Sequence, residues 1–374
     1  MKTDLNDYLI SIEHALEHPD SVIPWDFKQT DINTILRTYS SLPIPPTPDY
    51  PICTLPRCNE PSDASGFCSP LHATQYKEIR NSPIRVRVIG HCWPNPTASM
   101  KEFGMGCKDT FSYTWNRIQL VDSEPFDYTV VINRPPYNIE VDKTKTIIFH
   151  MEPNMEKSPH IWGEEWSNPQ GYLRVFKHST DYNNLQWHLN RTYSELMNEL
   201  QQPIPTKEDK VSIVISGKYS DIGHTLRWNL AHDLTETDIP VAFYGANNRF
   251  KLPNHMGPLP HLTKDIGMYP YKYHIAIENH ENYNYTTEKL VDGILSECLT
   301  FYWGAPNVRS LINPNAYVHL TTSNPREIIE TIRTAIKEDW WSQRIHHIRE
   351  EKKRIINELA FMPRLEKFLL SIEE

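Results

Sequence analysis

The polar side chains best suited to ligand chemistry lie between residues 276 and 306, at the two ends of one short predicted helix. They are Glu278, Asn279, Tyr285, Glu288 and Lys289. Glu278 and Asn279 directly follow the apolar run YHIAI, which is typical of a central strand in a parallel sheet. Ligands of open α/β sheets bind beyond the carboxyl ends of the strands, so this pair stands where a ligand would lie.

The next helix is predicted to begin after Thr286 or Thr287, either of which can accept a hydrogen bond from its first turn. Glu288 and Lys289 then occupy that turn, where free N–H groups and the positive end of the helix dipole attract a phosphate. A first-turn lysine is unfavourable for the helix itself, which indicates a role in binding. The alternative is that both residues are ordinary surface residues.

Short apolar runs alternate with helical patterns along most of the chain, which predicts parallel sheets covered on both faces. The pattern begins near residue 84 and restarts after a polar, proline-containing linker at 198–209. We therefore expect two Rossmann-like halves. The expected divisions are an N-terminal appendage at 1–80, an acceptor-side domain at 81–205, a donor-binding domain at 206–345 and a helical segment at 346–374.

Residues 276–320 resemble the donor-binding motif of the α1,3-fucosyltransferases, glycosyltransferase family 10. The matching positions are Glu278-Asn279, Tyr285-x-Thr287-Glu288-Lys289 and Tyr302-Trp303-Gly304-Ala305-Pro306. A fainter similarity in the same order extends over about residues 84–355. The sequence departs from the motif at His280, where Ser or Thr is common, and at Asn284.

The resemblance implies a GT-B fold, in which two Rossmann-like domains face a cleft, and an inverting transfer of fucose from GDP-fucose to a glycan hydroxyl. It places the catalytic carboxylate at Glu152, as general base, and a phosphate-binding arginine at Arg227. Lys289 would share the diphosphate with Arg227, Glu288 would accept bonds from sugar hydroxyls, and Tyr285 and Asn279 would lie against the nucleotide. Tyr285 could equally be a packing residue, and Arg227 a surface residue paired with an acid.

Two further residues could contact the acceptor. His91 and Trp93 follow the first predicted strand, and both could stack on a sugar ring, although a core role for Trp93 and a structural role for His91 are equally open. The chain contains no Asp-x-Asp pair of the kind that holds the metal in GT-A enzymes. We therefore expect basic side chains, and no catalytic metal, to bind the leaving diphosphate.

A cysteine cluster in the appendage has metal-binding spacing. Its members are Cys53, Cys58, Cys68 and His72, in the pattern C-x4-C-x9-C-x3-H. Four soft ligands within twenty residues favour a closed, structural zinc site, with free thiols or a disulfide as the alternatives. Such a module could also dock a protein partner.

The overall composition indicates the class of the main ligand and the location of the protein. The 374 residues are 39% hydrophobic and 23% charged, with a net charge of −9 and a pI near 6.0, which argues against nucleic acid as the main ligand. No apolar run approaches the length of a membrane span, so we expect a soluble, cytoplasmic protein without a membrane anchor. Two rival functions remain: the same fold with another nucleotide-sugar, which His280 favours, or a zinc-module interaction protein with a degenerate transferase domain.

Overall fold

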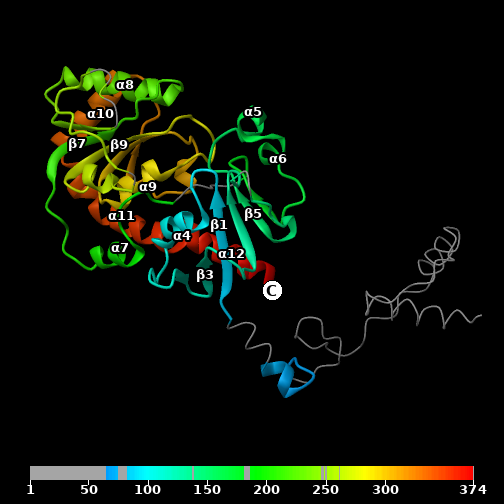
Figure 1. Cartoon of the computed structure of the whole chain (residues 1–374). Helices are drawn as coiled ribbons and strands as arrows, with labels where there is room; N and C mark the ends of the chain where they lie inside the picture. Colours follow the sequence, from blue (N-terminus) through cyan, green and yellow to red (C-terminus); the bar gives the residue numbers. More distant parts are fainter. Residues whose placement is uncertain are drawn as a thin grey trace, which may run out of the picture. The chain divides into compact units, whose positions relative to one another are not determined.

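The computed structural model divides the chain into two compact units, residues 1–80 and 81–374, and the second unit carries both sheets (Figure 1). It describes residues 65–74, 82–136, 139–180, 186–245, 248, 251–260 and 262–373. In the first unit the described residues form one short piece whose residues 70–74 are helical.

The first sheet of the larger unit has the strand order β2-β3-β1-β4-β5-β6. Its strands are β1 Ile84–Gly90, β2 Thr114–Trp115, β3 Ile118–Val121, β4 Tyr128–Ile132, β5 Thr146–Phe149 and β6 Arg174–Phe176. All neighbouring strands pair in parallel except β2 and β3. The alternating pattern predicted to begin near residue 84 therefore starts with a strand, and all four residues of β5 are buried, as a central parallel strand requires.

The second sheet is entirely parallel, in the order β11-β10-β9-β7-β8. Its strands are β7 Glu208–Val214, β8 Val241–Tyr244, β9 Tyr271–Ile277, β10 Leu299–Trp303 and β11 Tyr317–His319. The order reverses at β9 and β7, because the chain fills one side of the sheet before the other. A parallel sheet opens a ligand crevice at such a switch point.

Helices cover both sheets and connect their strands (Figure 1). They are α4 Pro96–Gly104, α5 Pro159–Trp162, α6 Glu164–Ser167, α7 Tyr193–Glu199, α8 Ile222–Thr235, α9 Glu288–Leu295, α10 Pro325–Lys337, α11 Trp340–Arg354 and α12 Phe361–Glu373. The predicted start of α9 is confirmed, because the Thr287 side chain accepts a hydrogen bond from the Lys289 N–H. Asn324 caps α10 in the same way, ahead of Pro325. The long C-terminal helical stretch breaks at Asp339, which has a positive φ of 50°.

The last helix returns to the first sheet. Phe361, Met362 and Leu365 of α12 are buried in the core built around β1, β4 and β5, whereas Ile345 and Ile348 of α11 belong to the core of the second sheet. Glu366 of α12 also accepts a 2.8 Å hydrogen bond from the indole of Trp115. The predicted segment 346–374 therefore contributes to both cores.

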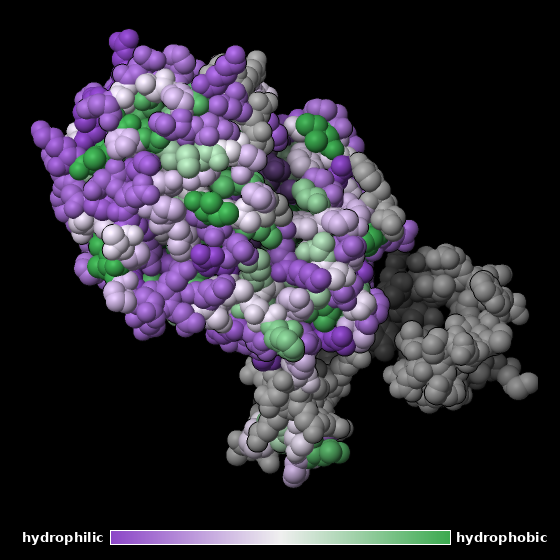
Figure 2. All heavy atoms as spheres, turned by 60° about the vertical axis from the view of Figure 1, so that its left-hand side comes forward, coloured by the Kyte–Doolittle hydropathy of each residue, from purple (hydrophilic) through white to green (hydrophobic). Residues whose placement is uncertain are grey.

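The surface of the described residues is mostly polar. Figure 2 shows a face of hydrophilic side chains on which apolar residues are scattered rather than gathered into one broad patch. Within the part of the chain that the structure describes, no helix is both long enough and apolar enough to cross a lipid bilayer.

Candidate active site

The carboxyl ends of β7 and β9 and the first turns of α8 and α9 surround a cavity of about 240 Å³. Its polar lining includes Ser216, Lys218, His224, Arg227, Lys264, Asn279, Glu288 and Lys289. Four of these side chains are cationic and one is a carboxylate, so the cavity is suited to an anion. Four predicted ligand-binding residues, Arg227, Asn279, Glu288 and Lys289, meet in this one cavity.

Glu278 lies behind the cavity and not in its wall. The residue has no exposed surface, and its carboxylate accepts bonds from the Thr287 N–H at 2.8 Å and from the Thr287 hydroxyl. Lys289 Nζ lies 3.2 Å from Glu278 Oε2. Glu278 therefore holds the first turn of α9 and its lysine in position, rather than touching a ligand.

Two glycines leave room for this arrangement. A Cβ on Gly304 would lie 2.5 Å from Glu278 Cγ, and a Cβ on Gly223 would lie 1.7 Å from the Glu278 carbonyl oxygen. Gly223 N also donates to the Asn279 carbonyl at 3.0 Å, which joins the first turn of α8 to the end of β9. Only glycine permits this close approach.

Arg227 of α8 points its guanidinium at the cavity from a buried position, with 5% of the residue exposed. Its Nη2 donates to the Asn279 side chain. Its Nε is buried and has no hydrogen-bond partner among the described residues. A buried donor left unpaired costs free energy, so this group is available for a ligand oxygen.

The charge states of the first turn of α9 are fixed by its neighbours. Burial alone would raise the pKa of Glu288, but the nearby Lys264 and Lys289 outweigh burial and hold that pKa well below its usual value. Burial would lower the pKa of Lys289, but Glu278 and Glu288 raise it. Glu288 is thus ionised and Lys289 protonated, with Lys264 3.2 Å from Glu288.

His280, the departure from the family motif, lies beside the start of α8. Its Nε2 is 3.5 Å from Asp221, and the other oxygen of Asp221 lies 2.8 Å from Nδ1 of His224, which lines the cavity. Burial and the nearby Arg227 lower the pKa of His224. His280 is therefore separated from the cavity wall by the Asp221–His224 pair.

The loop between β9 and α9 contacts the first sheet's half of the molecule. Asn284 donates to the His178 carbonyl at 2.7 Å, and His178 Nδ1 donates back to the Asn284 carbonyl at 3.1 Å. Asn284 has a positive φ of 59°, a conformation that asparagine tolerates better than most residues. Tyr285 is buried beside it, edge-on to His178, which gives Tyr285 a packing position away from the cavity.

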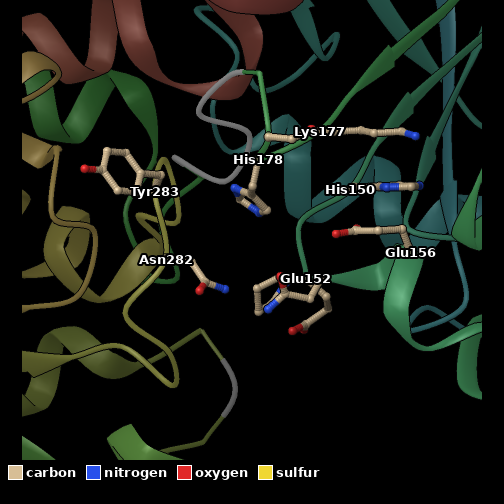
Figure 3. A pocket seen from close by; sticks show the side chains of 10 residues that line it. His150, Glu152, Glu156, Lys177, His178, Asn282 and Tyr283 are labelled. Atoms are coloured by element: carbon tan, nitrogen blue, oxygen red, sulfur yellow. The ribbon is translucent and has the colours of Figure 1, made fainter.

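A second, smaller cavity of about 200 Å³ lies where this loop meets the end of β5, and it contains Glu152 (Figure 3). Figure 3 shows Glu152, Glu156 and His178 around its centre, with Asn282 entering from the opposite loop. Asn133 Oδ1 accepts from Met151 N at 2.7 Å and from Glu152 N at 3.3 Å, which fixes the backbone that carries the carboxylate.

The carboxylate of Glu152 is the strongest candidate base in this cavity. Glu152 keeps exposed surface, but the protein atoms around it still raise its pKa by desolvation, with Lys289 acting in the opposite direction. One loop connects the two cavities, because Asn279 lines the cationic cavity and Asn282 lines the cavity of Glu152. A carboxylate with a raised pKa is better matched to proton abstraction near neutral pH than an ordinary one.

The two predicted acceptor-side residues have different surroundings. Trp93 donates to Glu102 at 2.8 Å and packs against Phe103, which is a structural environment. His91 is half-buried, and its ring lies edge-on to Trp162 with centroids 5.2 Å apart.

The cysteine cluster is only partly described. Cys53 and Cys58 lie outside the described residues. Cys68 Sγ and His72 Nδ1 are 2.9 Å apart, so the two described members of the C-x4-C-x9-C-x3-H pattern are brought together. Among the described residues, no group of three or more potential ligands is gathered at one place.

Sequence reasoning missed four residues of the cationic cavity. Ser216 and Lys218 follow β7, so the strand-end argument used for Glu278 would have found them. His224 precedes Arg227 by one helical turn and faces the same way. No sequence pattern pointed to Lys264 as a cavity residue, because it lies in an irregular segment, the 3₁₀ turn Lys264–Gly267.

Comparison with known proteins finds relatives in sequence. Residues 204–359 match the sequence model described as "Glycosyltransferase family 10 (fucosyltransferase) C-term". A stretch of 50 residues is 38% identical to the alpha-(1,3)-fucosyltransferase FucT of Helicobacter pylori, and it makes up 13% of this chain. The match spans only 10% of the H. pylori protein.

Two solved structures align with most of this chain. An alpha1,3-fucosyltransferase with GDP aligns over 74% of this chain and 91% of its own, with a TM-score of 0.42 and 16% identity. An alpha-glucosyltransferase in complex with UDP and DNA aligns over 78% of this chain and 100% of its own, with a TM-score of 0.51 and 8% identity. The second likeness supports a GT-B-like fold.

The role of Glu278 as a buried support can be tested by Glu278→Gln. Loss of the charge leaves Lys289 without its buried partner, so we expect the free energy of unfolding to fall by roughly 3 kcal/mol. Urea denaturation followed by circular dichroism measures the change. The matched control is Glu281→Gln, an exposed residue of the same loop, which should shift stability by less than about 0.5 kcal/mol. Equal stability of the two variants would contradict the assignment.

Proposed function

Since residues 204–359 match the sequence model of glycosyltransferase family 10, the fucosyltransferases, we propose that this protein transfers fucose from GDP-fucose to a hydroxyl of a glycan acceptor, with inversion at the sugar carbon. The observation that carries the proposal is the buried Arg227 guanidinium, whose Nε has no partner among the described residues and which lines a cavity with three lysines. Such a cavity fits a nucleoside diphosphate.

In this proposal the cationic cavity holds the donor. Arg227 grips the diphosphate with its planar fork, and Lys289 and Lys218 add point charges. The first turns of α8 and α9 offer N–H groups to the same phosphates. These groups stabilise the negative charge that develops as the diphosphate leaves. In other transferases a metal ion has this role. Glu288 is ionised and can accept bonds from sugar or ribose hydroxyls.

Glu152 would act from the opposite side of the cleft. Its carboxylate accepts the proton of the acceptor hydroxyl while that oxygen attacks the anomeric carbon of the donor sugar. The bond from this carbon to the diphosphate oxygen breaks at the same time, and the nucleoside diphosphate leaves. Attack opposite the leaving group inverts the configuration at that carbon.

Two alternatives from the sequence remain distinguishable. Another nucleotide-sugar could occupy the same fold, with His280 and its partner Asp221 altering the wall near the sugar. A degenerate transferase that serves as a binding module is less well supported, because Glu152, Arg227 and Lys289 are all retained around the two cavities. Comparison of GDP-fucose with UDP-sugars in a thermal-shift assay separates these functions. Stabilisation or turnover with a UDP-sugar alone would overturn the assignment of the donor.

Removal of a cavity cation should weaken donor binding. We expect Lys218→Gln and Arg227→Gln to raise the Kd for GDP, by roughly tenfold or more for Arg227, because each loses a charge-assisted bond to phosphate. Isothermal titration calorimetry measures the Kd. Lys218 is exposed, so its variant tests the cavity without risk to the fold. Arg333→Gln, at an exposed site on α10, is the charge-matched control and should leave the Kd unchanged. Unaltered GDP binding in both cavity variants would refute the phosphate site.

Loss of the base should abolish transfer and spare donor binding. Glu152→Gln is expected to lower kcat by roughly 10²–10⁴-fold while its Kd for GDP stays near that of the wild type. The pKa of Glu152 is raised, so kcat/KM of the wild type should fall with decreasing pH at a value above that of an ordinary glutamate. This acidic limb should be missing from the residual activity of the variant. Full transfer by Glu152→Gln would exclude the base.

We also propose a structural zinc site built from Cys53, Cys58, Cys68 and His72, and a role for this module in docking a protein partner. The 2.9 Å approach of Cys68 and His72 supports the last two ligands, since a zinc ion would bridge them.

Zinc content tests the metal site directly. The full chain should carry about one zinc per molecule, released on treatment of the thiols with a mercurial and measured with a chromogenic chelator. Cys68→Ser should lose most of this zinc. Cys92→Ser, which removes an exposed cysteine of the other unit, should keep it. A zinc-free wild type would rule the site out.

A further inference from the structure

A groove on the first sheet's half lies outside the site described above. Its volume is about 460 Å³, within the range of ligand pockets. It is formed by the segment after β4, the segment before β5, helices α5 and α6, and the segment before β6. Figure 1 shows α5 and α6 beside the end of β5, the strand that leads to Glu152.

Three aromatic side chains line the groove: Trp162, Trp166 and Tyr172. Trp166 and Tyr172 contact each other with ring centroids 5.5 Å apart, and both pack against the small core of Ile89, Val131 and Ile148. All three aromatic residues are half-buried, so each keeps open surface while its orientation is held by neighbours. Fixed aromatic surfaces bind the apolar faces of a ligand at little entropic cost.

The polar lining of the groove is charged but balanced. Arg134 and Lys143 face Glu140 and Glu165, two cations against two carboxylates. Glu165 accepts a 2.9 Å bond from the Tyr172 hydroxyl and lies 2.7 Å from Lys143 Nζ. Carboxylates and cations of this kind can exchange hydrogen bonds with hydroxyl groups, and the balanced charge gives no advantage to an anionic or a cationic ligand. A neutral, hydroxyl-rich chain with apolar faces matches this lining.

The groove is joined to the Glu152 cavity by two short links. Asn133 holds the backbone of Met151 and Glu152, and the next residue, Arg134, lines the groove. On the other side, the N–H of His91 donates to the Arg134 carbonyl at 2.9 Å, while the His91 ring contacts Trp162. A ligand that presents a hydroxyl to Glu152 therefore has this groove beside it.

We propose that the groove binds neutral sugar units of the acceptor glycan that lie beyond the unit receiving the transferred sugar. The inference rests on the proposed transferase function and adds to it a binding surface for the acceptor outside the cavity of Glu152. Trp162 and Trp166 stack on pyranose faces, and Glu165 and Arg134 bind hydroxyls. His91 belongs to the boundary between this groove and the cavity.

Chain-length dependence of binding tests this proposal on the full protein. The probes are neutral oligosaccharides of two and six units, from the chitin and the N-acetyllactosamine series, titrated in the presence of GDP by calorimetry. In at least one series we expect the six-unit probe to bind about tenfold more tightly than the two-unit probe, which corresponds to about 1.4 kcal/mol.

Substitutions in the groove test whether the higher affinity for the longer probe comes from the groove. Trp162→Ala and Glu165→Gln should reduce the preference for the longer probe to twofold or less while the affinity for the two-unit probe changes little. Phe111→Ala, an aromatic deletion at a fully exposed site of the same half, should preserve the preference. Glu165 is exposed and its pairing with Lys143 is a surface ion pair, so its variant reports on the groove even if loss of Trp162 disturbs the fold.

Four other outcomes would contradict the groove proposal. An equal preference for length in the wild type and both groove variants overturns the proposal, as does a wild type that binds GDP but none of the oligosaccharides. A monomer–dimer change caused by Trp162→Ala, seen by light scattering, would assign the groove to a second copy instead. A wild type that does not bind GDP overturns the proposed transferase function itself, and the groove proposal then falls with it.

Discussion

A single buried carboxylate, that of Glu278, sets the geometry of the cationic cavity. A carboxylate without exposure is costly unless charged and hydrogen-bonding partners surround it. Here the partners are Thr287 and Lys289, both at the start of α9, so the strand end and the helix start cannot shift independently. The position of Lys289, which lines the cationic cavity, is thereby tied to β9.

The same constraint explains the glycines around it. Gly304 must lack a side chain because Glu278 Cγ occupies that space, and Gly223 must lack one because α8 approaches the Glu278 carbonyl. That approach brings Arg227 against Asn279 and into the cavity wall. A short run of polar residues in the sequence is thus one connected structure, in which some members hold the backbone in place and others line the cavity.

Sequence patterns predicted the strands and the start of α9 well, because buried parallel strands and capped helices leave strong local signals. The strand-end rule also found Glu278. It could not distinguish a residue that holds the backbone in place from one that lines the cavity. A polar residue at that position looks the same in sequence whether it points to a ligand or to the neighbouring helix. Lys264 and the groove residues Trp162 and Trp166 lie on irregular segments or very short helices, where spacing carries little information. The return of α12 to the first sheet depends on long-range packing that local periodicity does not encode.

That return has a consequence for how such a chain could be recombined. The core of the half that contains Glu152 is assembled from buried residues between Ile84 and Phe176 together with Phe361, Met362 and Leu365 at the far end of the chain. The second sheet and its helices lie in the interval between these two pieces. A chimaera that exchanges only the N-terminal piece between relatives would place a foreign α12 against the transplanted sheet. The half that contains Glu152 therefore cannot be exchanged as one contiguous segment, and the C-terminal helix must be exchanged with it.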